Sequence, residues 1–229
     1  MADPKTYLFD LPGAKRPSKA TIREEWYPGV KDYWDRSTSS RIFDAILGVR
    51  AVIIHATAGH NSSGAMSVMR DGRASWHWLV ADEDEDAHGS HVWACAPEAR
   101  AAWHVRNAVS DPRVNGGAKR VNHWSLGIEI VNSQKQSPLD PFSDWQVAET
   151  ARIVRYCWAK YPNLSQVVSH ALLDPSRRSD PGTHFPWDSF KALVLDGPAE
   201  KSVEELFPGV AALSELPSSR GIELCCTVT

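Results

Sequence analysis

Two histidines in this chain each end an apolar run that is typical of a buried strand. His55 lies in VIIHATAG at residues 52–59, and His170 ends QVVSH at residues 166–170. The small residues after His55 contribute little to packing, but they allow other groups to approach closely and the chain to turn. We therefore expect the sheet to open onto a cleft at this point. Asp180 follows ten residues after His170, in an Asp-Pro-Gly turn whose proline and glycine hold the carboxylate in place.

Two imidazoles and one carboxylate are a suitable ligand set for a catalytic metal. Zinc at a catalytic site takes three protein ligands from His, Asp, Glu or Cys and leaves a fourth position for water. His55, His170 and Asp180 therefore form a candidate zinc site. A plainer interpretation stays open at this point, because single histidines are also common as hydrogen-bonded core or surface residues. Sequence separation alone does not bring residues 55 and 170 together.

The elements expected to position these residues alternate between strands and helices. Strands are predicted over 50–56, 75–81, 91–95, 126–131 and 166–170, and helices over 61–69, 144–160 and 187–195. Ser143 and Gln146 form a capping-box pattern that starts the longest helix. Its apolar face is expected to pack on the sheet, opposite a polar face of Gln146, Glu149, Arg152 and Arg155. This order predicts the α/β fold class, with a mixed central β-sheet flanked by helices.

The composition excludes several classes of partner. The 229 residues carry a formal net charge of −3, so no basic surface indicates a nucleic-acid or anionic-membrane partner. No apolar run reaches the length of a membrane span, and the first residues lack the apolar core of a signal peptide. We therefore expect a cytoplasmic protein without membrane insertion, with release by lysis or signal-less secretion left open. The four cysteines, at 95, 157, 225 and 226, lack CxxC spacing and are expected as reduced thiols.

The length favours a single domain with extensions at both ends. We expect residues 1–47 to be an N-terminal extension that packs on the domain, and residues 48–196 to be the catalytic domain. Residues 197–229 form a C-terminal extension of unassigned role, with a short helix predicted at SVEELF. The acidic run DEDEDAHGSH at residues 82–91 is interpreted as a charged hairpin loop, because it contains no closed set of metal ligands.

Four motifs occur in the order, and at about the separations, of a known enzyme family. They are VIIHATAG, AWH at 102–104, NHWSLGIEIVN at 122–132 and SHALLDPSRRSDPG at 169–182. Over residues 48–195 the chain resembles the zinc-dependent N-acetylmuramoyl-L-alanine amidases of type 2, a superfamily that includes the peptidoglycan recognition proteins. It is most similar to the bacterial cytosolic amidases that act on anhydro-muropeptides. The resemblance implies zinc in a groove above a mixed sheet, and cleavage of the amide between N-acetylmuramic acid and L-alanine.

The resemblance also implies roles for individual residues. It places the metal on His55, His170 and Asp180, in agreement with the set chosen from residue types, and a catalytic carboxylate on Glu129. The alternation in LGIEIV sends Glu129 to the face opposite Leu126, Ile128 and Ile130, so that it can take a proton from the attacking water. A solvent-facing strand carboxylate is the alternative interpretation of Glu129.

The sequence departs from the family pattern at Arg178, where many relatives carry lysine. Arginine keeps the positive charge that stabilises an oxyanion, but it cannot deliver a proton at ordinary pH. Trp103, His104, Arg120 and Asn122 match positions that line the groove, contact the sugar or position the loop in relatives. Ordinary packing and a solvated loop are the alternatives for these four residues.

Two functions of different class are left open by the sequence. The first is zinc-dependent hydrolysis of the N-acetylmuramic acid to L-alanine amide in peptidoglycan or muropeptides. The second is a non-catalytic peptidoglycan or muropeptide recognition module of the same fold. Non-catalytic relatives typically lack a metal ligand, whereas this chain keeps all three together with Glu129, which favours the enzyme. Wall recycling, a phage-type lysin and a secreted effector are all compatible with this sequence, and it does not predict the oligomeric state.

Overall fold

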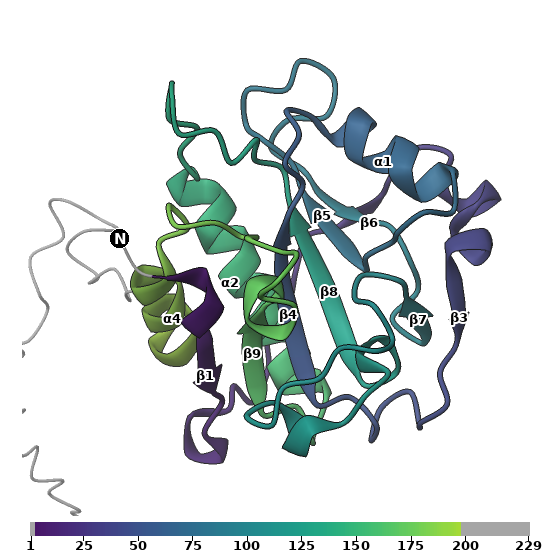
Figure 1. Ribbon diagram of the computed structural model, residues 1–229, viewed down its shortest axis with the longest axis vertical. Coiled ribbons are helices and arrows are strands. Elements are labelled where there is room, and N and C mark those ends of the chain that lie inside the picture. Colours follow the sequence, from purple (N-terminus) through teal and green to yellow (C-terminus); the bar gives the residue numbers. More distant parts are fainter. Residues whose placement is uncertain (1–2, 198–229) are drawn as a thin grey trace, which may run out of the picture. The chain divides into compact units, whose positions relative to one another are not determined.

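The computed structural model describes residues 3–197, and their centre is a mixed sheet of seven strands (Figure 1). From one edge to the other the strands are β1 (Leu8–Asp10), β9 (Gln166–Ser169), β4 (Ala51–Ala56), β8 (Ser125–Ile130), β5 (Trp78–Val80), β6 (Val92–Ala94) and β2 (Glu25–Trp26). Strands β9, β4, β8 and β5 run parallel, whereas β1 is antiparallel to β9 and β6 is antiparallel to β5. Strands β3 (Thr38–Ser40) and β7 (Arg100–Ala102) form a second, antiparallel sheet.

Helices cover both faces of the large sheet. Helices α2 (Asp144–Lys160) and α4 (Trp187–Asp196) pack on one face, and α1 (Ser62–Arg70) packs on the other, as Figure 1 shows. The short helix α3 (His170–Leu173) follows β9 directly. Short 3-10 helices lie at Pro4–Thr6, Gly13–Lys15, Val30–Asp32, Trp34–Ser37, Asn115–Gly117 and Val121–His123. These layers confirm the predicted α/β class.

Strand alternation decides which side chains face the site. In β8, Leu126, Ile128 and Ile130 enter the core under α2, so Glu129 projects from the opposite face, as the alternation predicts. In β4, Val52 and Ile54 enter the same core. His55 is therefore on the Glu129 face, and the parallel register pairs His55 directly with Glu129. The sheet face under α2 is hydrophobic, and the opposite face carries His55 and Glu129.

Helix α2 confirms the predicted residues 144–160 but not the predicted polar face. The capping box is present, with the Ser143 hydroxyl accepting from the Gln146 backbone and the Gln146 side chain accepting from the Ser143 backbone. Gln146 and Glu149 are buried, so their placement on a solvent-facing side was wrong. The reason is tertiary: the Gln146 amide donates to the carbonyls of Ala81 and Val131, at 3.2 and 2.7 Å, where two strands end beneath the helix.

The N-terminal residues complete both edges of the large sheet. Strand β1 pairs with β9 and β2 pairs with β6. Between them, the Arg16 guanidinium donates to the carbonyls of Tyr161 and Leu164, at 2.7 and 3.2 Å, and so satisfies backbone acceptors just after α2. Without these residues β9, which leads directly into His170, would be an unprotected edge strand.

Several remaining expectations can be compared with the described residues. Strands β5 and β6 pair antiparallel, so residues 82–91 form the predicted hairpin loop. Cys95 and Cys157 are buried free thiols. Cys225, Cys226 and the predicted SVEELF helix lie outside the described residues. Among residues 3–197 no helix is both long enough and apolar enough to span a bilayer.

Candidate functional site

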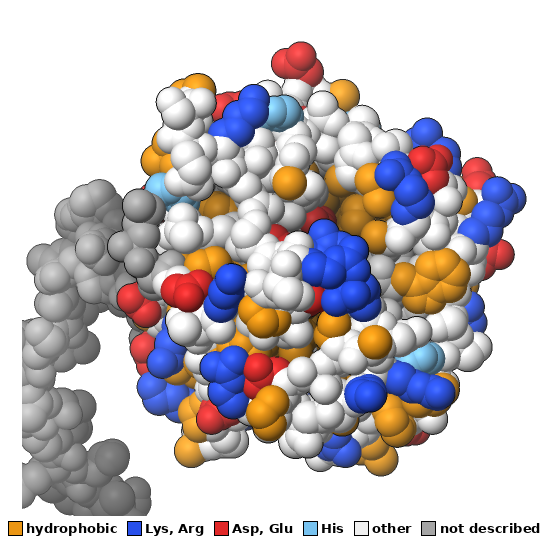
Figure 2. Space-filling model, in the orientation of Figure 1, with side chains coloured by type: hydrophobic (Ala, Val, Ile, Leu, Met, Phe, Trp, Pro, Cys, Tyr) orange, Lys and Arg blue, Asp and Glu red, His pale blue; other side chains and the backbone are white. Residues whose placement is uncertain are grey.

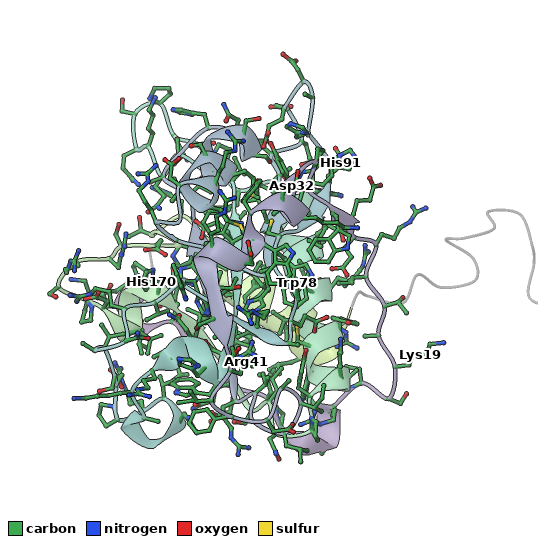
Figure 3. The ribbon with its side chains drawn as sticks, turned by 90° about the vertical axis from the view of Figure 1, so that its right-hand side faces the viewer. Lys19, Asp32, Arg41, Trp78, His91 and His170 are labelled. Carbon is green, nitrogen blue, oxygen red and sulfur yellow. The ribbon has the colours of Figure 1, made fainter. Side chains whose placement is uncertain are left out.

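Three buried side chains converge at the carboxyl ends of β4 and β9. His55 comes from β4, His170 is the first residue of α3, and Asp180 lies on the loop that follows α3. The two histidine Nδ1 atoms lie 3.0 Å apart, and Asp180 Oδ2 lies 3.2 Å from His55 Nδ1 and 3.0 Å from His170 Nδ1. The structure thus brings together the three residues that the sequence analysis selected as a ligand set. Figure 3 shows His170 to the left of Trp78, which is part of the hydrophobic core between the sheet and α2.

Local hydrogen bonds fix the positions of His170 and Asp180 relative to each other. The Ser169 hydroxyl accepts from the Leu172 backbone at 3.1 Å and caps α3. The Ala171 N–H donates to the Asp180 carbonyl at 2.9 Å, which ties the loop back to the helix. Gly182 takes a positive φ of 94° just after the ligand, a conformation that favours glycine. The loop is therefore a fixed turn around the Asp180 carboxylate.

A bidentate ion pair holds the start of the same loop. The Arg106 guanidinium donates through Nε and Nη2 to the Asp174 carboxylate, with both distances at 2.9 Å. The Asp174 carbonyl in turn accepts from the backbone N–H groups of Arg177 and Arg178 at 3.0 and 2.9 Å. This arrangement holds the backbone that carries both arginines next to the ligand cluster.

The protonation states of the cluster suit a metal ion. Burial and the nearby His170 lower the pKa of His55 to about 4, so its imidazole is neutral at pH 7. Burial alone would raise the pKa of Asp180, but its contacts with His170 and His55 outweigh burial and hold that pKa below its ordinary value. A neutral imidazole and an ionised carboxylate are the forms in which these groups bind metals.

The spacing of the three donor atoms also fits a metal. In a tetrahedral zinc site with ligands at about 2.1 Å, neighbouring ligand atoms lie roughly 3.4 Å apart. The observed separations of 3.0 to 3.2 Å are close to that value. His55, His170 and Asp180 are therefore a buried group able to hold a metal ion.

Glu129 lies beside this cluster on the neighbouring strand. Its side chain is 8% exposed and lines the same cavity as the three ligand candidates. Burial is the main cause that raises the pKa of Glu129 well above its usual value, and the like charge of Asp180 adds to it, while Arg178 opposes both. A carboxylate in such a place binds a proton strongly, which is the property that a general base needs.

The cluster opens into a cavity of about 410 Å³. The hollowed face in Figure 2 carries basic side chains beside its central depression. Arg177 and Arg178 are exposed residues of the cavity wall, and no ion pair with another described residue engages the Arg178 guanidinium. Trp76 and Gln134 also line the cavity, although the sequence analysis gave neither residue a role. For Gln134 the available signal was its place in the polar run NSQKQ just after β8.

The four residues expected to contact substrate have different environments. Trp103 is 38% exposed and lines a second cavity of about 290 Å³, which adjoins the first at His104 and Arg178. Asn122 is buried, and its amide accepts from the Val105 N–H at 2.9 Å and donates to the Val105 carbonyl at 2.8 Å. Both amide groups of Asn122 are thus committed to holding the loop.

Arg120 and His104 also have environments that differ from that of an exposed residue lining a substrate cavity. Arg120 is exposed, has a left-handed backbone with φ of 58°, and lines neither of these two cavities. His104 is buried at 7% exposure and lies against His55, with 3.0 Å between His104 Nδ1 and His55 Nε2.

Comparison with known proteins agrees with the geometry. The family described as N-acetylmuramoyl-L-alanine amidase matches residues 47–183. The chain is 32% identical over 146 residues to the N-acetylmuramoyl-L-alanine amidase AmiD of Escherichia coli, a match that covers 61% of this chain and 51% of AmiD. It is 30% identical over 123 residues to the 1,6-anhydro-N-acetylmuramyl-L-alanine amidase AmpD of Salmonella typhimurium, covering 53% of this chain and 58% of AmpD. The chain thus spans about half the length of the curated relatives it matches.

A solved structure of AmiD is similar to this fold. It is the complex of the E. coli enzyme with the substrate anhydro-N-acetylmuramic acid-L-Ala-D-gamma-Glu-L-Lys. The two chains superpose with a TM-score of 0.52 at 28% identity, covering 63% of this chain and 56% of AmiD.

Proposed function

The chain belongs to the N-acetylmuramoyl-L-alanine amidase family, and on that basis we propose that it hydrolyses the amide between N-acetylmuramic acid and L-alanine. Peptidoglycan or soluble muropeptides are the proposed substrates, because the similar AmiD structure holds an anhydro-muropeptide. Residues 48–196 are the proposed catalytic domain. The single observation that carries the proposal is the buried His55, His170 and Asp180 cluster, with Glu129 paired beside His55 in the sheet.

Zinc is the proposed metal, held by His55, His170 and Asp180. When bound, zinc would supply a Lewis acid that lowers the pKa of a water molecule and polarises the amide carbonyl. The donor set of two imidazoles and one carboxylate is one that zinc accepts at catalytic sites.

The chain's own residues carry the proton transfers and the charge stabilisation. We assign Glu129 as the general base that takes a proton from the attacking water and then delivers it to the leaving alanine nitrogen. Its raised pKa supports this role, since a base that binds its proton strongly can hold it between the two steps. Arg178, exposed at the cavity wall, supplies a fixed positive charge near the oxyanion. Arginine stays protonated, so an acid role for this residue is not proposed.

Mass spectrometry of purified muropeptides after incubation with the zinc-loaded chain tests the reaction and the bond together. The expected products are the free stem peptide, starting with L-alanine, and the intact muramic acid sugar. Asp180→Ala removes one ligand and is expected to lower the zinc content and abolish product formation. Muropeptide binding without cleavage by the wild-type chain would instead support the recognition module.

A further inference from the structure

His104 has no ring nitrogen left for a substrate. The side chain is buried, with Nδ1 3.0 Å from His55 Nε2 and Nε2 3.2 Å from the Ser125 hydroxyl. Both polar atoms of the ring therefore point to other protein groups. This arrangement connects one of the three ligand candidates to the hydroxyl of Ser125, the first residue of β8.

The donor and the acceptor of each hydrogen bond can be assigned by starting from the Val121 carbonyl, which can only accept. The Ser125 hydroxyl donates to the Val121 carbonyl at 2.7 Å, and a hydroxyl has only one proton to donate. The Ser125 oxygen must then accept from His104, which puts the single proton of the neutral His104 ring on Nε2. His104 Nδ1 is left as an acceptor, and it receives the N–H of His55 Nε2. The lone pair of the neutral His55 ring is consequently on Nδ1, which faces His170 and Asp180.

Gly127 leaves the space that the His104 ring fills. A Cβ at this position would lie 2.7 Å from His104 Cγ and 2.9 Å from His104 Nδ1, so any side chain would displace the ring. Glycine in the interior of a strand weakens the strand, and it often marks a place where another group must approach closely. In β8 that group is the His104 ring.

We propose that His104 is a positioning residue for the metal ligand His55. Through Ser125 and the Val121 carbonyl, it holds His55 in the tautomer that presents Nδ1 to the ion. This inference rests on the proposed function of His55 as a zinc ligand. A second hydrogen-bonded nitrogen orients a ligand histidine and raises its basicity, and losing such a partner typically costs about 10- to 100-fold in metal affinity. His170 Nε2 has no partner among the described residues. Of the two ligand histidines, His55 is therefore the one whose second ring nitrogen is held by another side chain.

Zinc affinity of the full chain, measured by competition with a chromophoric chelator, tests the proposal without substrate. His104→Leu removes both hydrogen bonds and is expected to weaken zinc binding about 10- to 100-fold. Gly127→Ala should give a loss of similar size, because it displaces the ring. His104→Asn should lose less, since its amide oxygen replaces Nδ1 as the acceptor. His91→Gln is the matched control: His91 lies on the β5–β6 hairpin loop, and the variant should bind zinc like the wild type.

Nitrogen-15 NMR of the histidine side chains in the metal-free chain reports the tautomer directly. Wild-type His55 is expected to carry its proton on Nε2, and Ser125→Ala, which keeps the His104 ring but removes its acceptor, should give a mixture of His55 tautomers. If His104→Leu folds and binds zinc as tightly as the wild type, the proposal is overturned. If His104→Leu does not fold, an unchanged His55 tautomer in Ser125→Ala overturns it. A wild-type chain that binds no zinc would contradict the proposed function instead.

Discussion

At the residue scale, the register of two parallel strands determines what His55 and Glu129 can do. They are paired across β4 and β8, so the proposed metal ligand and the proposed proton acceptor project side by side from the same sheet face. Burial raises the pKa of Glu129 and lowers that of His55. Glu129 therefore binds a proton more strongly than an ordinary carboxylate, and His55 binds one more weakly than an ordinary imidazole. Such separated behaviour is typical of sites that carry out acid–base chemistry.

Glu129→Gln should separate metal binding from catalysis. The amide keeps the shape of the carboxylate but cannot take a proton, so zinc should remain bound while turnover falls by about 10²- to 10⁴-fold. Muropeptide kinetics and metal analysis of the same preparation measure the two effects. Glu83→Gln, on the exposed hairpin loop, is the matched control and should leave both unchanged. Near-normal turnover in Glu129→Gln would make Glu129 an ordinary strand carboxylate.

Arg178 can be tested by retaining or removing its charge. Arg178→Lys should keep much of the activity, whereas Arg178→Ala should lose about 3 kcal/mol of transition-state stabilisation, as is typical for one oxyanion donor. The loss should lower kcat and kcat/KM together, because the interaction forms in the transition state. Steady-state kinetics on muropeptides distinguishes this from a substrate-holding role, which would raise KM alone. An unchanged kcat in Arg178→Ala would direct attention to Arg177, which lines the same cavity.

At the scale of the elements, α2 supports the site face from behind the sheet. Its apolar residues fill the core under β4 and β8, and the amide of Gln146 binds the two carbonyls at the ends of β5 and β8. The same residue closes the capping box with Ser143. Gln146 thus couples the start of the helix to the edge of the sheet from which the cavity opens.

Gln146→Ala should therefore destabilise the protein more than the loss of a helix cap does. The substitution leaves the buried carbonyls of Ala81 and Val131 without this donor, and each unsatisfied buried group costs about 1–3 kcal/mol. We expect a total loss of roughly 2–4 kcal/mol in the free energy of unfolding, measured by urea denaturation. Ser143→Ala, the control that removes only the cap, should cost about 1 kcal/mol. Equal losses in the two variants would show that the Gln146 bonds to the sheet contribute nothing.

At the scale of the whole molecule, the site is built on a fold with its own hydrophobic core. The largest core cluster joins β1, β4, β8 and β9 with α2 and α4, and it lies on the sheet face away from the ligand candidates. A metal at the site would then add stability to a chain that is already folded, unlike the small domains that depend on their metal.

Chelation should therefore abolish amidase activity without unfolding the chain. We expect an unchanged far-ultraviolet circular dichroism spectrum after chelation. Because a ligand at 100 times its Kd stabilises the folded state by about 2.7 kcal/mol, zinc added back at that level should raise Tm by roughly 5–10 °C. Full hydrolytic activity in metal-free protein would contradict the metal-dependent mechanism. Loss of the circular dichroism spectrum on chelation would contradict the independent core.

Several features of the protein follow from local sequence patterns and could be predicted without the structure. The capping residues predicted α2 over residues 144–160, and alternation predicted the face of Glu129. The four motifs indicated the family, which the match over residues 47–183 confirms. These features could be read because each depends on residue types within one element, or on short motifs whose order along the chain is itself the signal.

The contacts between buried residues that are distant in the sequence could not be predicted and are seen in the folded protein alone. It brings His55 within 3.0 Å of both His170 and His104, which lie 115 and 49 positions away in the sequence. It also buries Gln146, which the sequence placed on a polar helix face, and it commits the Asn122 amide to the Val105 backbone. A hydrogen bond between distant segments leaves no periodic trace in either segment, because the folded backbone, and not the local sequence, places the donor next to its acceptor.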